Sequence, residues 1–123
     1  MSTKYEDLEV YKLSEKLSDI IWDIVVKWNS FEKDVVGRQL IKAADSVSAN
    51  ISEGSGKGSY IDYKRYLKIS RGSLFETKHW VNKAFKRKLL NDADKETITK
   101  MIDELIPRLS AFIKYMDTKS QIK

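Results

Sequence analysis

Residues 39–76 read QLIKAADSVSANISEGSGKGSYIDYKRYLKISRGSLFE, and this stretch decides the predicted architecture. Apolar and small residues recur every three or four positions on both sides of a segment rich in glycine and serine, EGSGKGS at 53–59. Such spacing places side chains on one face of a helix, and glycine adopts the positive φ of a tight turn without steric cost. The stretch therefore predicts two antiparallel amphipathic helices. We expect Gly54 just past the end of the first helix and Ser59 as the N-cap of the second.

The GSGKGS segment at 54–59 also invites comparison with a phosphate-binding loop. That motif requires a glycine five residues before its Gly-Lys pair, a preceding strand, and serine or threonine after the lysine. Here Ile51 and Gly58 occupy the two flanking positions, and the preceding residues have helical periodicity. We therefore interpret the segment as a turn between helices and not as a nucleotide site.

Outside this stretch the helical period continues in both directions. It predicts four helices at about 7–29, 35–53, 60–90 and 93–117, with a polar connection at 29–34. The sequence shows no strand alternation, internal repeat or linker. We therefore expect one all-α domain over residues 1–123, an up-down-up-down antiparallel four-helix bundle.

The composition narrows the classes of function. The 123 residues include no cysteine, no apolar run of membrane-spanning length and no signal-like N-terminus, so we expect a cytoplasmic protein. His79 is the only histidine and has no second ligand at metal spacing, and no serine has an evident neighbouring base. We expect neither an enzyme nor a metal or cofactor site.

The positive charge is concentrated in one part of the chain. Residues 57–88 contain ten lysines and arginines against Asp62 and Glu76, whereas the rest of the chain has a net charge of −3. One interpretation is an ordinary solvated helix face; the other is a strip that binds a polyphosphate backbone, with Phe75 available to stack on a base. The candidate nucleic-acid contacts are Lys57, Lys64, Arg65, Lys68, Arg71, Lys78, Lys83, Lys86 and Arg87.

The predicted helix at 60–90 also has an unusually broad apolar face. Its apolar arc covers roughly 200°, wider than the ~100° stripe that a helix at the edge of a monomeric bundle needs. Either a second copy of the chain or another protein would cover the excess. We predict self-association through Tyr66, Ile69 and Trp80, together with two aromatic side chains off the buried face of the first helix, Tyr11 and Trp22.

An ordered series of residues resembles a known family. The series is Gln39-Leu40, Ala43-Ala44, Ser46-Val47, Ala49-Asn50-Ile51, Glu53-Gly54, Tyr63, Leu67, Ile69, Gly72-Ser73 and Glu76, and the opening Tyr5-Glu6-Asp7-Leu8-Glu9-Val10-Tyr11 extends it. It is similar to the four helix bundle proteins encoded in intervening sequences of bacterial 23S ribosomal RNA genes, also called S23 ribosomal proteins. Ser52 and Ser70 stand where that family usually has alanine.

The resemblance implies a homopentamer of four-helix bundles. It also implies kinship with the accessory variability protein of diversity-generating retroelements, a basic pentamer that works with nucleic acid and a reverse transcriptase. No catalytic residue is carried over. Two hypotheses follow: a homo-oligomeric bundle that binds RNA or DNA non-specifically through the helix at 60–90, or a scaffold that binds another protein and no nucleic acid.

Overall fold

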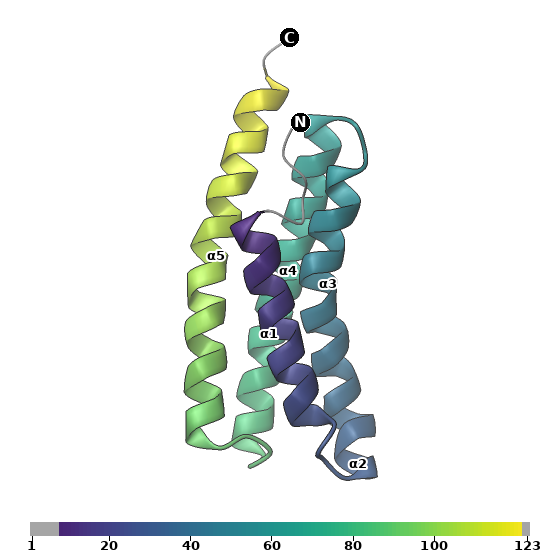
Figure 1. Cartoon of the computed structure of the whole chain (residues 1–123), viewed down its shortest axis with the longest axis vertical. Coiled ribbons are helices and arrows are strands. Elements are labelled where there is room, and N and C mark those ends of the chain that lie inside the picture. Colours follow the sequence, from purple (N-terminus) through teal and green to yellow (C-terminus); the bar gives the residue numbers. More distant parts are fainter. Residues whose placement is uncertain (1–7, 122–123) are drawn as a thin grey trace.

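The computed structural model describes residues 8–121, and these residues form four long helices and no strand. Successive long helices run in opposite directions, which confirms the predicted antiparallel order (Figure 1). α1 packs against α3 and α5, and α4 packs against the same two helices, so the bundle is closed. The elements are α1 (Glu9–Val25), α2 (Ser30–Glu32), the π-helical segment η2 (Lys33–Gly37), α3 (Arg38–Ser55), α4 (Tyr60–Lys86) and α5 (Asp92–Ser120).

The helices differ from the predicted ones mainly at their ends. The helix predicted at 7–29 is α1, which ends at Val25, and residue 7 lies outside the described residues. The helix predicted at 60–90 is α4, which ends at Lys86 because Lys88 has a left-handed backbone with φ of 66°. The helix predicted at 93–117 is α5, which begins at the Asn91 cap and extends to Ser120.

The second long helix begins five residues earlier than predicted. We predicted 35–53 with a polar connection before it, but helical structure runs from Ser30 through α2 and η2 to Ser55. Asn29 and Glu32 form a capping box: Glu32 N donates to Asn29 Oδ1 at 2.8 Å, and Asn29 N donates to Glu32 Oε1 at 3.3 Å. These two bonds satisfy backbone donors that the start of a helix leaves free, so polar residues here extend the helix.

The core lies where the four apolar stripes meet. Burying each large aliphatic side chain stabilises the fold by about 1.5–3 kcal/mol, which is why this periodic pattern dominates the architecture. Among residues 8–121, no helix is both long enough and apolar enough to cross a membrane. The largest fully buried side chains are Leu17, Ile21, Leu40, Ile51, Leu67, Leu74, Ile98, Ile102, Leu105, Leu109 and Met116.

A close contact between α3 and α4 occurs at Gly54. A Cβ atom placed on Gly54 would lie 2.8 Å from Tyr66 Cβ and 3.0 Å from Tyr63 Cδ1. Gly54 is therefore a buried residue inside α3, where the lack of a side chain lets α4 approach, and our prediction that it follows the helix end is wrong. The positive φ of the turn, 86°, belongs to Gly58, and Ser59 caps α4 as predicted by accepting from Asp62 N at 3.1 Å.

We predict opposite effects on stability from the same substitution at two glycines. Gly54→Ala should lower the free energy of unfolding by about 1–3 kcal/mol, because the new methyl group has no room between the helices. Gly72→Ala should raise it by up to about 1 kcal/mol, because Gly72 lies inside α4 with open space around it. Urea denaturation followed by circular dichroism measures both, and equal effects at the two sites would contradict the close contact at Gly54.

Tyr63 brings a polar group into the core without a partner. Its hydroxyl oxygen is the buried side-chain atom within residues 8–121 that lacks a hydrogen bond, while its ring packs edge-on against Phe112 with centroids 5.3 Å apart. Burial disfavours the charged phenolate and raises the pKa of Tyr63 to about 12. The ring stabilises the core, whereas the hydroxyl contributes a desolvation cost.

Tyr63→Phe should therefore leave stability at pH 7 unchanged or raise it by up to about 1 kcal/mol. The unfolded tyrosine ionises near pH 10, so the wild-type protein should lose stability between about pH 10 and pH 12 as the unfolded state gains the phenolate. Tyr63→Phe has no phenol at this position, so its free energy of unfolding should not include this loss, which is on the order of 2–3 kcal/mol over two units of pH. Denaturation at pH 7 and pH 11.5 checks this, with Tyr60→Phe at an exposed tyrosine as the control. A loss of stability at pH 7 in the Tyr63 variant alone would show that the hydroxyl has a partner.

Candidate nucleic-acid interface

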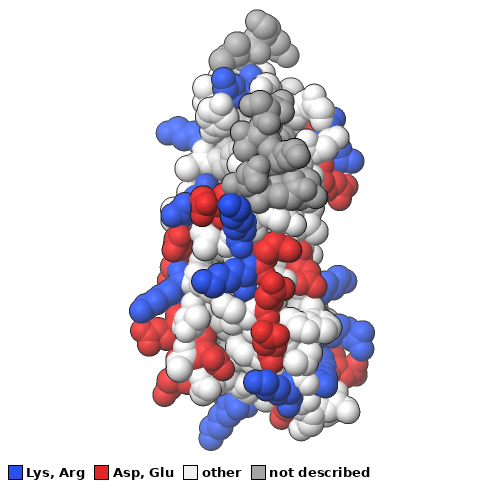
Figure 2. All heavy atoms as spheres, viewed as in Figure 1, with Lys and Arg blue, Asp and Glu red and all other residues white. Residues whose placement is uncertain are grey.

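Opposite sides of the bundle differ in charge. α1 and α4 each pack mainly on α3 and α5 and lie on opposite sides of the bundle (Figure 1). On the face seen from the α1 side, acidic side chains gather along the middle, over α1 and its seam with α3 (Figure 2). Asp19, Asp23 and Asp45 are exposed on these two helices. The cations predicted to bind nucleic acid belong to α4, except for Lys57 in the turn before it and Arg87 at its C-cap.

Three of those cations face α5. Lys64 Nζ lies 2.7 Å from Asp117 Oδ1, and Lys78 Nζ lies 3.1 Å from Asp103 Oδ1. Midway between these pairs, Arg71 Nη1 donates to Ser110 Oγ at 3.1 Å. Residues 64, 71 and 78 are spaced by seven, as are their partners 103, 110 and 117 on the antiparallel helix, so the three contacts form one line that we call the α4–α5 polar seam.

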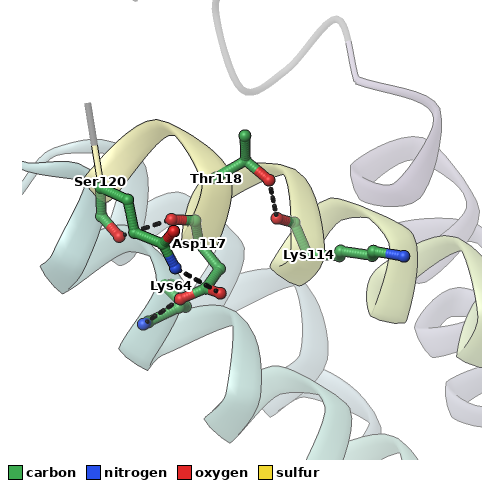
Figure 3. A network of polar contacts seen from close by, with 6 residues as sticks. Lys64, Lys114, Asp117, Thr118 and Ser120 are labelled. Atoms are coloured by element: carbon green, nitrogen blue, oxygen red, sulfur yellow. Dashed lines mark hydrogen bonds and ion pairs between the residues drawn. The ribbon is translucent and has the colours of Figure 1, made fainter.

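The polar seam engages three of the cations that we predicted to bind nucleic acid. At the upper end of the seam, Lys64 of α4 reaches across to Asp117 near the end of α5 (Figure 3). The hydrogen bond from Lys64, followed by its charge, lowers the pKa of Asp117. Arg71 is the exception within the seam, because its partner is a neutral hydroxyl and its charge is not compensated there.

Two further cations lie around Tyr66 near the turn. Lys57 Nζ is 5.2 Å from the centroid of the Tyr66 ring, and Arg65 Cζ is 4.7 Å from it. Each also has an acidic neighbour at 3.6 Å, Glu53 for Lys57 and Asp62 for Arg65. The hydrogen bond to Tyr66 is the largest cause of a raised pKa at Lys57. These cations therefore cover one of the aromatic rings that we predicted at an oligomer interface.

The remaining cations lie along the outer side of α4. Lys68, Lys83, Lys86 and Arg87 have no ion pair within residues 8–121, and we call them the α4 basic strip. The same side carries Phe75, which is 53% exposed, and the exposed His79, whose ring packs edge-on against Trp80 at 5.1 Å. Glu76 is the single carboxylate among the exposed residues of α4. This arrangement can hold phosphates and offer an aromatic face to a base.

The five residues predicted at an oligomer interface do not form one surface. Tyr11 and Trp22 lie on α1, with Tyr11 half-buried against the core and Trp22 54% exposed. Tyr66, Ile69 and Trp80 lie on α4, where Ile69 is 44% exposed and the other two are half-buried. Any assembly that uses all five therefore needs two different faces of each copy.

A small cleft of the described chain contains acidic side chains. Between α1 and α3, a cleft of about 290 Å³ is lined by Tyr11, Glu15 and Asp45, among others. Both carboxylates accept hydrogen bonds from serine hydroxyls, Glu15 from Ser48 at 2.6 Å and Asp45 from Ser18. Within residues 8–121, no group of three or more histidine, cysteine or acidic side chains is placed to hold a metal ion.

The model of a protein family, described as 23S rRNA-intervening sequence protein, matches residues 6–111. The chain belongs to this family. A crystal structure of a protein with unknown function from the S23 ribosomal protein family of Bacteroides thetaiotaomicron has a similar fold. It is 22% identical, the match covers 85% of this chain and 98% of that one, and the TM-score is 0.76. No curated protein matches the chain.

This member of the 23S rRNA-intervening sequence protein family has one further surface feature that our sequence reasoning missed. An apolar groove of about 920 Å³ lies between the end of α1 and the helix formed by α2, η2 and α3. Phe31, 75% exposed, lines it, yet residues 29–34 were predicted as a polar connection. The Asn29-x-x-Glu32 capping signature was the available signal, because it predicts that Phe31 lies on the first turn of a helix.

Proposed function

We propose that the protein is a non-catalytic, self-associating four-helix bundle that binds RNA or DNA without sequence preference through the α4 basic strip. The observation that supports this most directly is the pairing pattern of the cations. Four of those predicted to bind form ion pairs, at 3.6 Å or closer, whereas Lys68, Lys83, Lys86 and Arg87 form none within the described chain. Unpaired cations release counterions when they meet phosphates, and paired ones must first give up a partner.

Phe75 adds a contact that sequence-independent binding can use. Its ring is exposed on the same side of α4 as the basic strip, and every base has a face that can stack on it. The family's implied pentamer would present the strip several times, so that weak contacts combine into a useful affinity. Self-association is supported by the exposed Ile69 and Trp22, which lie on different faces of each copy.

Nucleic-acid binding should weaken steeply as the salt concentration rises, and it should require the α4 basic strip. Wild-type protein should bind a fluorescein-labelled 20-nucleotide single strand, with an affinity that falls as salt rises. The triple variant Lys68→Glu, Lys83→Glu, Lys86→Glu should bind at least about 10-fold more weakly and reduce the slope of log K against log salt by about 2. Fluorescence anisotropy at several salt concentrations measures both quantities.

A variant with the same change in net charge serves as the control. Lys12→Glu, Lys16→Glu and Lys27→Glu reverse three exposed cations on the α1 side, and this variant should bind like wild type. Equal losses in the two variants would show that total charge, and not the strip, governs binding. Absence of binding by the wild-type protein in 50 mM salt would remove the proposed nucleic-acid function.

A substitution on α4 tests the proposed self-association separately from nucleic-acid binding. Ile69→Asp places a charge on a residue that is 44% exposed in the protomer, so the fold should be retained. If this face meets another copy, the variant should have a lower mass in multi-angle light scattering than the wild-type protein, because the carboxylate would be buried without a partner. Unchanged mass and unchanged helicity would exclude this face as a subunit contact.

The apolar groove favours the second hypothesis, in which the protein is a scaffold that binds another protein. That function predicts a stoichiometric protein partner and no affinity for the labelled strand at any salt concentration.

A further inference from the structure

The exposed side of α4 carries two aromatic rings between two cations. Phe75 is 53% exposed, and His79, one helical turn further along, is also exposed. Lys68 precedes Phe75 by seven residues, and Lys86 follows His79 by seven residues. With 3.6 residues per turn, all four lie within a sector of about 40° around the helix axis. They therefore form one line in the order cation, ring, ring, cation, which we call the α4 aromatic line.

The packing of the protomer does not account for the middle of this line. Phe75 belongs neither to the hydrophobic core of residues 8–121 nor to the partly buried side chains packed against it. Gly72, beside the line between Lys68 and Phe75, has open space where a Cβ would lie, although glycine is unfavourable inside a helix. The ring is thus free to stack on a ligand, and the backbone beside it can be approached closely.

The charges along the line favour an anion at its two ends. Lys68 and Lys86 are exposed and form no ion pair within residues 8–121. Glu76, the one carboxylate among the exposed residues of α4, lies about 100° around the helix from Phe75 and therefore outside the line. The ring of His79 is restrained by its edge-on contact with Trp80, with centroids 5.1 Å apart.

We propose that the α4 aromatic line is a stacking platform for the unpaired bases of single-stranded RNA or DNA. Two bases stack on Phe75 and His79, while the flanking phosphates meet Lys68 and Lys86. The inference rests on the nucleic-acid binding proposed above and names the form of nucleic acid that the site takes. A single strand thereby gains contacts that a duplex lacks.

The spacing of the rings supports a single strand as the ligand. Phe75 and His79 are four residues apart, which is about 6 Å along the helix axis. Successive nucleotides of one strand in a duplex are only ~3.4 Å apart along its axis. Paired bases also have both faces covered by their neighbours, so a duplex offers the rings no free face. An unstacked strand can extend to bring one base to each ring, whereas a duplex can use only its phosphates.

The experiment removes both rings from the full chain and compares three ligands. Phe75→Ala with His79→Ala should keep wild-type helicity, because both positions are exposed and alanine favours a helix. The ligands are the labelled 20-nucleotide single strand, its duplex, and an abasic strand of equal length that keeps the phosphates and has no bases. Fluorescence anisotropy measures the affinity for each of them.

The wild-type protein should bind the single strand at least about 10-fold more tightly than the abasic strand. The ring variant should lose at least about 10-fold on the single strand alone, and its affinities for the duplex and the abasic strand should match wild type. Its slope of log K against log salt should not change, because the rings release no counterions. The triple lysine variant, by contrast, should bind all three ligands more weakly and with a smaller slope.

Phe31→Ala is the matched control, because it removes an aromatic ring that is 75% exposed and lies outside α4. This variant should bind all three ligands like wild type. If the ring variant binds the single strand like wild type, or loses equally on all three ligands, base stacking is excluded while nucleic-acid binding stands. Equal wild-type affinity for the single strand and the abasic strand would also overturn the inference. A wild-type protein that binds none of the three ligands would overturn the proposed function as well.

Discussion

The contact between α3 and α4 determines where the rest of the chain can lie. Gly54 brings the backbones together against Tyr63 and Tyr66, and about two turns further down Ser70 donates a buried hydrogen bond of 2.6 Å to the carbonyl oxygen of Val47. A buried hydroxyl that bonds across to another helix fixes the rotation of its own helix as well as the distance between the two. Once that rotation is set, Leu67, Leu74 and Val81 face the core. The outer side of α4, with its cations, must then face solvent.

The rotation of α4 also divides its positive charge between two uses. Lys64, Arg71 and Lys78 fall on the flank nearest α5, where Asp117, Ser110 and Asp103 meet them. Ion pairs of this partly exposed kind contribute little stability each, about 0–1 kcal/mol, but they favour one antiparallel register over its neighbours. Lys68 and Lys86 are exposed and form no ion pair among the described residues, although the charge of Lys68 also helps to lower the pKa of Asp117. A count of cations along the sequence therefore overstates the charge that is free to bind.

Most of the fold was predictable, because it depends on local periodicity and caps. The buried stripe of α5, the presence of a turn before residue 60 and the Ser59 cap all follow from spacing and residue type, and the antiparallel order follows from short connections. The polar seam was not predictable, because it depends on which residues of α5 lie opposite Lys64, Arg71 and Lys78. The role of Gly54 was missed for a related reason: glycine at a helix end and glycine at a helix contact look alike in a sequence.

The groove and the basic strip lie on different sides of the bundle, and this separation has a functional consequence. α1, which supplies Trp22 to the groove, is across the bundle from α4, which supplies Lys68 and Lys83 (Figure 1). A partner that occupied the groove would therefore leave the basic strip uncovered. Occupation of the groove and nucleic-acid binding through α4 are thus compatible, because no side chain that lines the groove belongs to α4.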